Sequence, residues 1–237
     1  MRYDTKLEKV TVGSAPGFHQ ELSIEVIADF NRAIDDMFAE LQARGEQDLL
    51  TDLCPYFGTV WDSARALSNV LAAKPAGFFT GSSFLEIGCG LAIPSMVAMI
   101  RGAASVVATD IHPDVPAFLE RNLRANGLEG RPGFQYMPVD WRRDAGLVLA
   151  APVTCILGSD ILYDRGQAGA VAAFLGMAFA RRGSGRGAER AIITDPGRPY
   201  LQDFESACKG VGLSVNVEIF RIDPADKKRD VFVLGIE

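Results

Sequence analysis

The segment Phe84-Leu85-Glu86-Ile87-Gly88-Cys89-Gly90-Leu91-Ala92-Ile93-Pro94 decides the fold of this chain. A short apolar run leads into two glycines, and a second apolar run with an early proline follows. This order is typical of a strand, a tight turn and a helix, in which a missing Cβ lets a ligand approach the backbone. A dinucleotide turn, G-x-G-x-x-G/A, needs a small residue where this chain has Ile93. The segment therefore predicts a ligand-binding turn at a strand end, but not a dinucleotide site.

Short apolar runs alternate with helical runs after Gly81, which indicates βαβ units around a parallel sheet. The runs at 213–220 and 230–236 are joined by too few residues for a crossover helix, so we expect an antiparallel hairpin there. The prediction is an α/β fold with a Rossmann-like, seven-stranded, mostly parallel sheet, helices on both faces and a C-terminal antiparallel hairpin. The other expected strands are 83–87, 105–109, 134–139, 153–159 and 190–194, and the helices between them are 92–101, 113–126, 166–181 and 199–210.

The first part of the chain has a different pattern. Apolar residues recur every three or four positions from Glu21 to Arg44, and Gly45 follows, so the pattern predicts one amphipathic helix. A second helix is expected from Trp61 to Ala73. We therefore divide the chain into an N-terminal helical extension, 1–55, and a sheet domain, 56–237.

Composition excludes several classes of protein. The chain has 237 residues, and its 30 acidic and 24 basic residues give a net charge of −6, which disfavours nucleic acid as a partner. Its four cysteines form no CxxC pair and only two histidines are present, so we expect no metal site and a reducing compartment. No apolar run approaches the ~20 residues of a membrane span, which predicts a cytoplasmic protein without membrane contact.

Acidic residues close the five expected parallel strands. Carboxyl ends of parallel strands meet at one edge of a sheet, where ligands of such folds bind. One acid at a strand end is commonly a helix cap, but five together predict a ligand rich in hydrogen-bond donors, such as a ribose, an amine or a cation. The five are Glu86, Asp110, Asp140, Asp160 and Asp195.

The glycine turn resembles motif I, (D/E)-x-G-x-G-x-G, of the class I, seven-β-strand S-adenosylmethionine-dependent methyltransferases, with Ala92 at the third glycine. Further segments are similar to the methyltransferase family 16 branch, which includes protein-lysine methyltransferases that act on the β subunit of electron-transfer flavoprotein. The resemblance covers about residues 56 to 237. Its segments are 58–67 (G-x-x-x-W-x-x-A-x-x-L), Val139-Asp140-Trp141, 158–164 (with D-x-x-Y) and Asp195-Pro196-Gly197-Arg198.

The resemblance implies S-adenosylmethionine as cofactor and assigns roles to ten residues. An indole face suits an adenine ring or a sulfonium cation, which agrees with the two tryptophans of this set. The expected cofactor-binding residues are Glu86, Gly88 and Gly90 for the methionine moiety, Asp110 for the ribose, Asp140 and Trp141 for the adenine, and Trp61 and Ser159 along the rest of the cofactor. The expected catalytic residues are Asp160 and Tyr163.

We expect Asp160 to orient an incoming amine and Tyr163 to hydrogen-bond or wall the acceptor channel. A carboxylate beside a lysine amine anchors it but hinders loss of its proton, so the proton is expected to leave to water. The structural alternatives are that Asp160 caps the next helix and that Tyr163 only packs. His112 is interpreted as a turn residue near the ribose, and Cys89 is rejected as a nucleophile because no histidine lies near it in sequence.

The predicted function is methyl transfer to a lysine amine of a protein substrate. Two alternatives stay open: a methyltransferase of the same fold that acts on a small amine or other metabolite, and a non-enzymatic binding scaffold. A wide-open mouth would favour a protein acceptor, whereas a lid formed by residues 1–55 would favour a metabolite. The cluster Lys227-Lys228-Arg229 in the last hairpin is a candidate docking contact for an acidic protein surface.

Overall fold

A seven-stranded sheet forms the centre of the protein in the computed structural model, which describes residues 2–14, 16–163, 165–223, 225–226 and 229–237. Its strand order is β5-β4-β3-β6-β7-β9-β8. Strands β3 to β7 run parallel, and β9 is antiparallel to both of its neighbours, so the predicted α/β fold and C-terminal hairpin are confirmed. The strands are β3 Ser83–Ile87, β4 Ser105–Asp110, β5 Phe134–Pro138, β6 Cys155–Ser159, β7 Arg190–Asp195, β8 Val215–Arg221 and β9 Asp230–Ile236.

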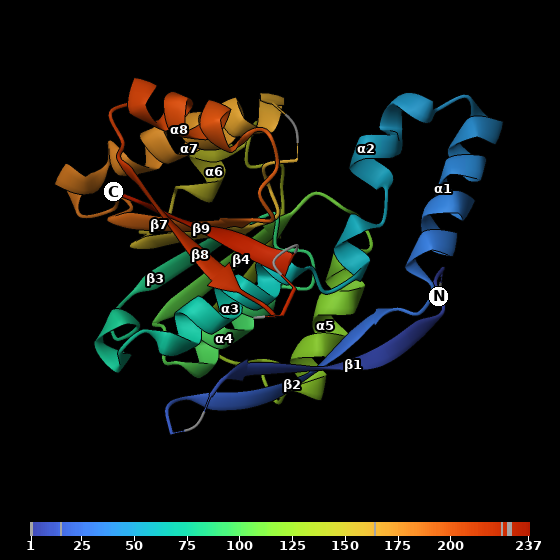
Figure 1. Ribbon diagram of the computed structural model, residues 1–237, viewed down its shortest axis with the longest axis horizontal. Coiled ribbons are helices and arrows are strands. Elements are labelled where there is room, and N and C mark those ends of the chain that lie inside the picture. The colour runs from blue at the N-terminus through green and yellow to red at the C-terminus, as the bar shows by residue number, and fades with distance from the viewer. Residues whose placement is uncertain (1, 15, 164, 224, 227–228) are drawn as a thin grey trace.

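Helices cover both faces of the sheet (Figure 1). Alternate residues of each strand enter opposite layers: Phe84 packs with the first layer, and Leu85 and Ile87 pack with the second. Both faces of the central strands are therefore buried, which explains their nearly continuous apolar sequence. The first layer holds α3 Asp62–Ala73, α4 Ile93–Ile100 and α5 Val115–Ala125, and the second holds α6 Ala145–Val148, α7 Arg165–Phe179 and α8 Leu201–Gly210.

The N-terminal extension differs from its prediction. It begins with an antiparallel hairpin, β1 Thr5–Gly13 and β2 His19–Ile27, and only then forms α1 Phe30–Arg44 and the short α2 Leu50–Leu53. The expectation of one helix over 21–44 is therefore wrong in its first part. Leu22, Ile24 and Val26 alternate as in a strand and are all buried. The helix begins late because the Asp29 carboxylate caps it, accepting the Arg32 N–H at 3.0 Å.

The hairpin forms an outer layer across α3 and α5 (Figure 1). One edge of β2 faces α5, where side-chain amides take the place of a neighbouring strand. Asn122 Oδ1 accepts the Glu25 N–H at 2.6 Å, and Asn126 both accepts the Ser23 N–H at 2.9 Å and donates to the Ser23 carbonyl at 2.8 Å. These bonds satisfy the backbone of β2 and join the extension to the sheet domain.

The topology sets the position of the site. Strand β3 lies between β4, which follows it in sequence, and β6, so the strand order reverses there. Open α/β sheets bind ligands outside the carboxyl ends of their strands at such a switch point. Within the described ranges, no helix is long and apolar enough to cross a bilayer.

Candidate active site

A pocket of about 500 Å³ lies at the carboxyl ends of the parallel strands, beside the switch point. This volume is within the range of small-molecule and cofactor sites. All of the predicted site residues line the pocket except Glu86. Those that do are Trp61, Gly88, Gly90, Asp110, Asp140, Trp141, Ser159, Asp160 and Tyr163.

The glycine turn between β3 and α4 forms the floor of the pocket. Gly88 and Gly90 have φ angles of 64° and 50°, in the left-handed region that glycine adopts without strain. A Cβ on Gly88 would meet the Ile161 side chain at 3.0 Å, so a larger residue would crowd the turn. Ala92, at the position of the third glycine, is also left-handed at 55°. The turn thus presents backbone without side chains to a ligand.

Glu86 lies behind this turn and is fully buried. Its Oε2 accepts the backbone N–H of Ser95 at 3.0 Å and the Ser95 hydroxyl, which ties β3 to the first turn of α4. Burial raises the pKa of Glu86 to about 8, although the bonds from Ser95 act against the rise. In this position the carboxyl group supports the turn from outside the pocket wall.

Asp110 closes β4 and anchors two loops. Its Oδ2 accepts the Gly90 N–H and its Oδ1 accepts the His112 N–H, both at 2.9 Å. Burial raises the pKa of Asp110, and these backbone bonds oppose the rise. The carboxylate therefore holds the glycine turn against the β4 loop at the edge of the pocket.

His112 links that loop to the N-terminal extension. Its Nδ1 accepts the Asp114 N–H at 3.1 Å, so Nε2 carries the proton and donates to the Leu53 carbonyl at 3.0 Å. Burial lowers the pKa of His112, which favours this neutral form. The bond fixes α2, and Leu50, Asp52 and Cys54 join the pocket lining. These three residues were not predicted, because no local sequence pattern indicates where the extension folds back.

Asp140 and Trp141 follow β5 and line the pocket. Arg142 donates to Asp140 from its backbone N–H at 3.0 Å and from Nε at 2.8 Å. Burial acts to raise the pKa of Asp140, but the bonds from Arg142 outweigh it and the pKa is lowered. The Trp141 ring packs edge-on against Phe174 at 5.5 Å between centroids and is almost completely buried. Arg142 also lines the pocket and was not among the predicted site residues.

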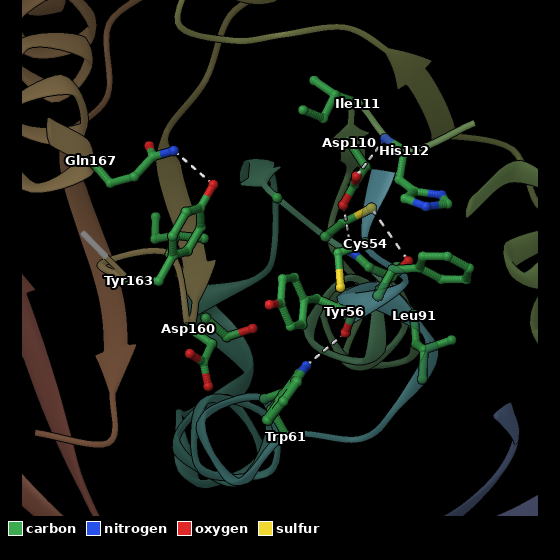
Figure 2. A pocket seen from close by; sticks show the side chains of 18 of the residues that line it. Cys54, Tyr56, Trp61, Leu91, Asp110, Ile111, His112, Asp160, Tyr163 and Gln167 are labelled. Carbon is green, nitrogen blue, oxygen red and sulfur yellow. Dashed lines mark hydrogen bonds between the residues drawn. The ribbon is translucent and has the colours of Figure 1, made fainter. Parts of the chain in front are cut away.

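Aromatic side chains occupy the other side of the pocket. Figure 2 shows Tyr163, Tyr56 and Trp61 near Asp160, whereas Asp110 and His112 lie across from them. The Trp61 Nε1–H donates to the Tyr56 carbonyl at 2.8 Å, and Tyr163 Oη accepts from Gln167 at 2.7 Å. Tyr56 and Tyr163 are 51% and 45% exposed, so they form the rim.

Asp160 closes β6 in an unusual conformation and is paired with an arginine. Its φ of 62° is left-handed, and its carboxylate forms an ion pair with the Arg198 guanidinium. Burial raises the pKa of Asp160, while the charge of Arg198 acts to lower it. The same guanidinium pairs with Asp195 at 3.0 Å. Asp195 itself is fully buried behind the pocket, so three of the five predicted carboxylates, those of Asp110, Asp140 and Asp160, reach its surface.

Other predicted features lie outside the pocket lining or are inert. Arg229 forms a two-point ion pair with Asp62 at 2.8 and 2.7 Å, whereas Lys227 and Lys228 are outside the described residues. Cys89 does line the pocket, but burial raises the pKa of its thiol well above the usual value, which disfavours the nucleophilic thiolate.

Comparison with known proteins finds one matching family model, described as lysine methyltransferase, over residues 47–182. A Mus musculus electron transfer flavoprotein beta subunit lysine methyltransferase is 28% identical over 147 residues, which are 62% of this chain and 52% of that protein. An Emericella nidulans protein N-terminal and lysine N-methyltransferase is 23% identical over 216 residues, 77% of this chain and 80% of that protein. The chain thus spans about half the length of the flavoprotein-directed relative.

Solved structures share the fold. The magnesium protoporphyrin IX methyltransferase of Synechocystis PCC 6803, solved with bound S-adenosylmethionine, superposes with a TM-score of 0.57 at 15% identity. The match covers 88% of this chain and 96% of that one. At this identity the likeness supports the architecture alone.

Proposed function

Because the chain belongs to the lysine methyltransferase family whose model matches residues 47–182, we propose that it transfers a methyl group from S-adenosylmethionine to a lysine amine of a protein substrate. The flavoprotein-directed and other lysine-directed relatives support this choice of acceptor. The β subunit of electron transfer flavoprotein is the first substrate to test.

The residues of the pocket fit S-adenosylmethionine. Gly88 and Gly90 present backbone without side chains to the pocket, which suits the methionine moiety. Asp110 offers carboxylate oxygens to ribose hydroxyls, and Asp140 with Trp141 offers an acceptor and a ring to adenine. Trp61 and Ser159 would line the rest of the cofactor, and Glu86 would support the turn from behind.

When bound, S-adenosylmethionine would supply a sulfonium-activated methyl carbon, to which an amine lone pair would bond while the C–S electron pair leaves with sulfur as a neutral thioether. The protein's contribution is mainly positioning, since an in-line arrangement can supply much of the rate. Asp160 would orient the amine by accepting its N–H. Tyr163 would form the wall of the acceptor channel, and the amine proton would leave to water at the rim.

The observation that supports a protein as the methyl acceptor is the difference between the two sides of the pocket mouth. Leu50, Asp52 and Cys54 cover the side of Asp110, so the extension closes the proposed cofactor end. On the side of Asp160, the half-exposed Tyr56 and Tyr163 leave the rim open. A long lysine side chain can enter from a large partner there. This opening favours a protein over a metabolite that a lid would enclose.

Two further parts of the proposal come from the sequence. The cytoplasmic location is supported by the four cysteines, all of which are free and buried. The division into residues 1–55 and 56–237 is retained as a proposed boundary, although the family match begins at residue 47.

Labelled S-adenosylmethionine tests the proposal. The protein is incubated with host extract and, separately, with recombinant electron transfer flavoprotein β subunit, and the labelled residue is identified by mass spectrometry. We expect label on lysine, reduced at least tenfold by Asp160→Asn and unchanged by Asp36→Asn, an exposed acid of α1. Label only in small molecules would replace the proposal with metabolite methylation. Failure of the folded protein to bind S-adenosylmethionine by calorimetry would replace it with a scaffold role.

A further inference from the structure

Arg198 cross-links the two acids that close the neighbouring strands β6 and β7. Asp195, fully buried at the end of β7, accepts the Gly197 and Arg198 N–H groups at 2.8 and 2.7 Å and pairs with the guanidinium at 3.0 Å. The guanidinium also pairs with Asp160 at the end of β6. Arg198 lines the pocket, whereas Asp195 lies behind it. The arginine thus presents a cation to the pocket beside Asp160.

Asp160 needs such a partner to hold its position. Its backbone is left-handed, a conformation that is strained for a residue with a Cβ. Its N–H donates to the Thr194 carbonyl of β7 at 2.9 Å, and Arg198 fixes the carboxylate. Backbone and side chain are therefore both constrained by the β7 end, which leaves the carboxylate in one orientation toward the pocket.

We propose that Arg198 is a positioning residue that orients Asp160 and, through its charge, keeps the acceptor lysine amine in its neutral, reactive form. The inference rests on the proposed lysine methylation. A carboxylate alone would stabilise the lysine ammonium, which has no lone pair to attack a methyl group. A guanidinium beside that carboxylate opposes the effect, so Asp160 can hold the amine without retaining its proton, and the proton passes to water.

Several charged groups lie around the Asp160 carboxylate. Ser63 on α3 also lies close enough to Asp160 to act to lower the pKa of that carboxyl, and Tyr163 precedes α7 on the same side of the pocket. The loop after β5 contributes the paired Asp140 and Arg142, which neutralise each other. Arg198 is therefore the charge that decides whether an amine near Asp160 meets a lone carboxylate or an ion pair. Among the described residues, the charged groups that line the pocket or pair with Asp160 are Asp160, Asp195, Arg198, Asp140, Arg142, Asp52 and Asp110.

The test is the pH dependence of kcat, measured with labelled S-adenosylmethionine and saturating electron transfer flavoprotein β subunit. The acid limb of kcat reports the acceptor amine in the complex. We expect Arg198→Gln to move this limb up by about one pH unit, and Arg198→Lys to restore it to within a few tenths. Arg124→Gln is the matched control, because Arg124, on the exposed face of α5, also joins two acids, Glu120 of the same helix and Glu129 beyond its end.

A second readout needs no turnover. Carboxyl ¹³C NMR of aspartate-labelled protein, assigned with Asp160→Asn, is expected to show a higher pKa for Asp160 in Arg198→Gln than in the wild type. If Arg198→Gln does not fold, Arg198→Gln with Asp195→Asn removes the buried charge. The acid limb of kcat should still move up relative to the wild type, but by less. Asp195 lies behind the pocket, so loss of its charge offsets only part of the loss of the Arg198 charge.

The outcomes separate this inference from the proposed function. An acid limb that stays in place in folded, active Arg198 variants overturns the role of Arg198 while lysine methylation stands. If the pKa of Asp160 is the same in Arg198→Gln and in the wild type, the inferred action of the Arg198 charge on Asp160 is overturned. A wild-type protein that labels no lysine at any pH overturns the proposed function itself, whatever the NMR titration shows.

Discussion

Asp110, a proposed cofactor ligand, also has a structural role at the edge of the pocket. Both of its oxygens accept backbone N–H groups, from Gly90 and from His112, so the residue shapes the turn on which a cofactor would rest. The sequence predicted a strand-end acid here and, by resemblance, a ribose ligand. The structure adds the reason that a neutral substitute is expected to be costly: two loops depend on the same carboxylate.

Asp110→Asn is expected to weaken S-adenosylmethionine binding about 10- to 100-fold, since an amide can replace only one of the two charged acceptors. Calorimetric titration with S-adenosylmethionine measures the change in Kd. Asp35→Asn, at an exposed position on α1, is the control and should leave Kd unchanged. Equal Kd values for both variants and the wild type would show that Asp110 does not contribute to the site.

Glu86 is expected to make the stability of the protein fall between about pH 4.5 and pH 8. Its pKa is about 8 when folded and about 4.5 when unfolded, so the unfolded chain releases this proton first. The stability that Glu86 contributes is complete below its pKa in the unfolded chain and is lost as pH rises through its pKa in the folded protein. The loss is on the order of 5 kcal/mol for a shift of this size.

Urea unfolding of wild type and Glu86→Gln at about pH 5 and pH 8.5 measures this effect. The glutamine keeps an acceptor for Ser95 and cannot ionise, so the variant should equal the wild type at the lower pH and exceed it at the higher one. A constant difference between the two proteins across this range would mean that Glu86 ionises in the folded protein as easily as in the unfolded chain.

At the scale of elements, the contact between β2 and α5 explains where the sequence-based prediction failed. Apolar residues of 21–27 satisfy the spacing of a helix and of a strand at once, because Ile24 and Ile27 fit a period of 3.6 while Leu22, Ile24 and Val26 fit a period of 2. The strand is stabilised by β1 at one edge and, at the other, by the amides of Asn122 and Asn126, about a hundred residues later. The periodicity of residues 21–27 contains neither contact.

Asn122→Ala is expected to lower the free energy of unfolding by about 2 kcal/mol. The substitution removes the fully buried Asn122 amide, which accepts the Glu25 N–H and donates to the Glu25 carbonyl. Urea or thermal unfolding measures the loss, and Asn216→Ala on the exposed side of β8 provides the control. Equal stabilities for the two variants would show that the edge contact is dispensable.

At the scale of the whole molecule, the hairpin β1–β2 is part of the main core. Val10, Val12 and Ile24 are fully buried and join the same apolar cluster as α3, α4 and α5. The extension also closes one end of the pocket through α2. Residues 1–55 are therefore coupled to the sheet domain in packing and in the site, although they precede it in the chain.

Two substitutions in the hairpin test this coupling. Ile24→Ala should lower the free energy of unfolding of the whole protein by about 2–5 kcal/mol, because it leaves a cavity against α5. Leu7→Ala, at a position in β1 that is 67% exposed, should change it by less than about 0.5 kcal/mol. Both are measured by urea unfolding with a probe in the sheet domain. A transition that Ile24→Ala leaves unmoved would mean that the hairpin unfolds separately.

The sheet and the composition of the site were predictable from the sequence, because both depend on local signals. Periodicity separated the strands from the helices after residue 83, and parallel topology by itself assembled the acids at one edge. The glycine turn has the conformation that its spacing indicates, since glycine is the residue that adopts left-handed φ angles without strain.

Tertiary structure alone decided which groups meet. It turned part of a predicted helix into a strand, placed Glu86 behind the pocket, brought α2 over one end through His112, and paired Asp160 with Arg198. Each of these results depends on contacts between residues distant in sequence, or on depth below the surface, and neither quantity is encoded in a local pattern. The sequence determined the residue types at the site, and packing determined which of them face the ligand.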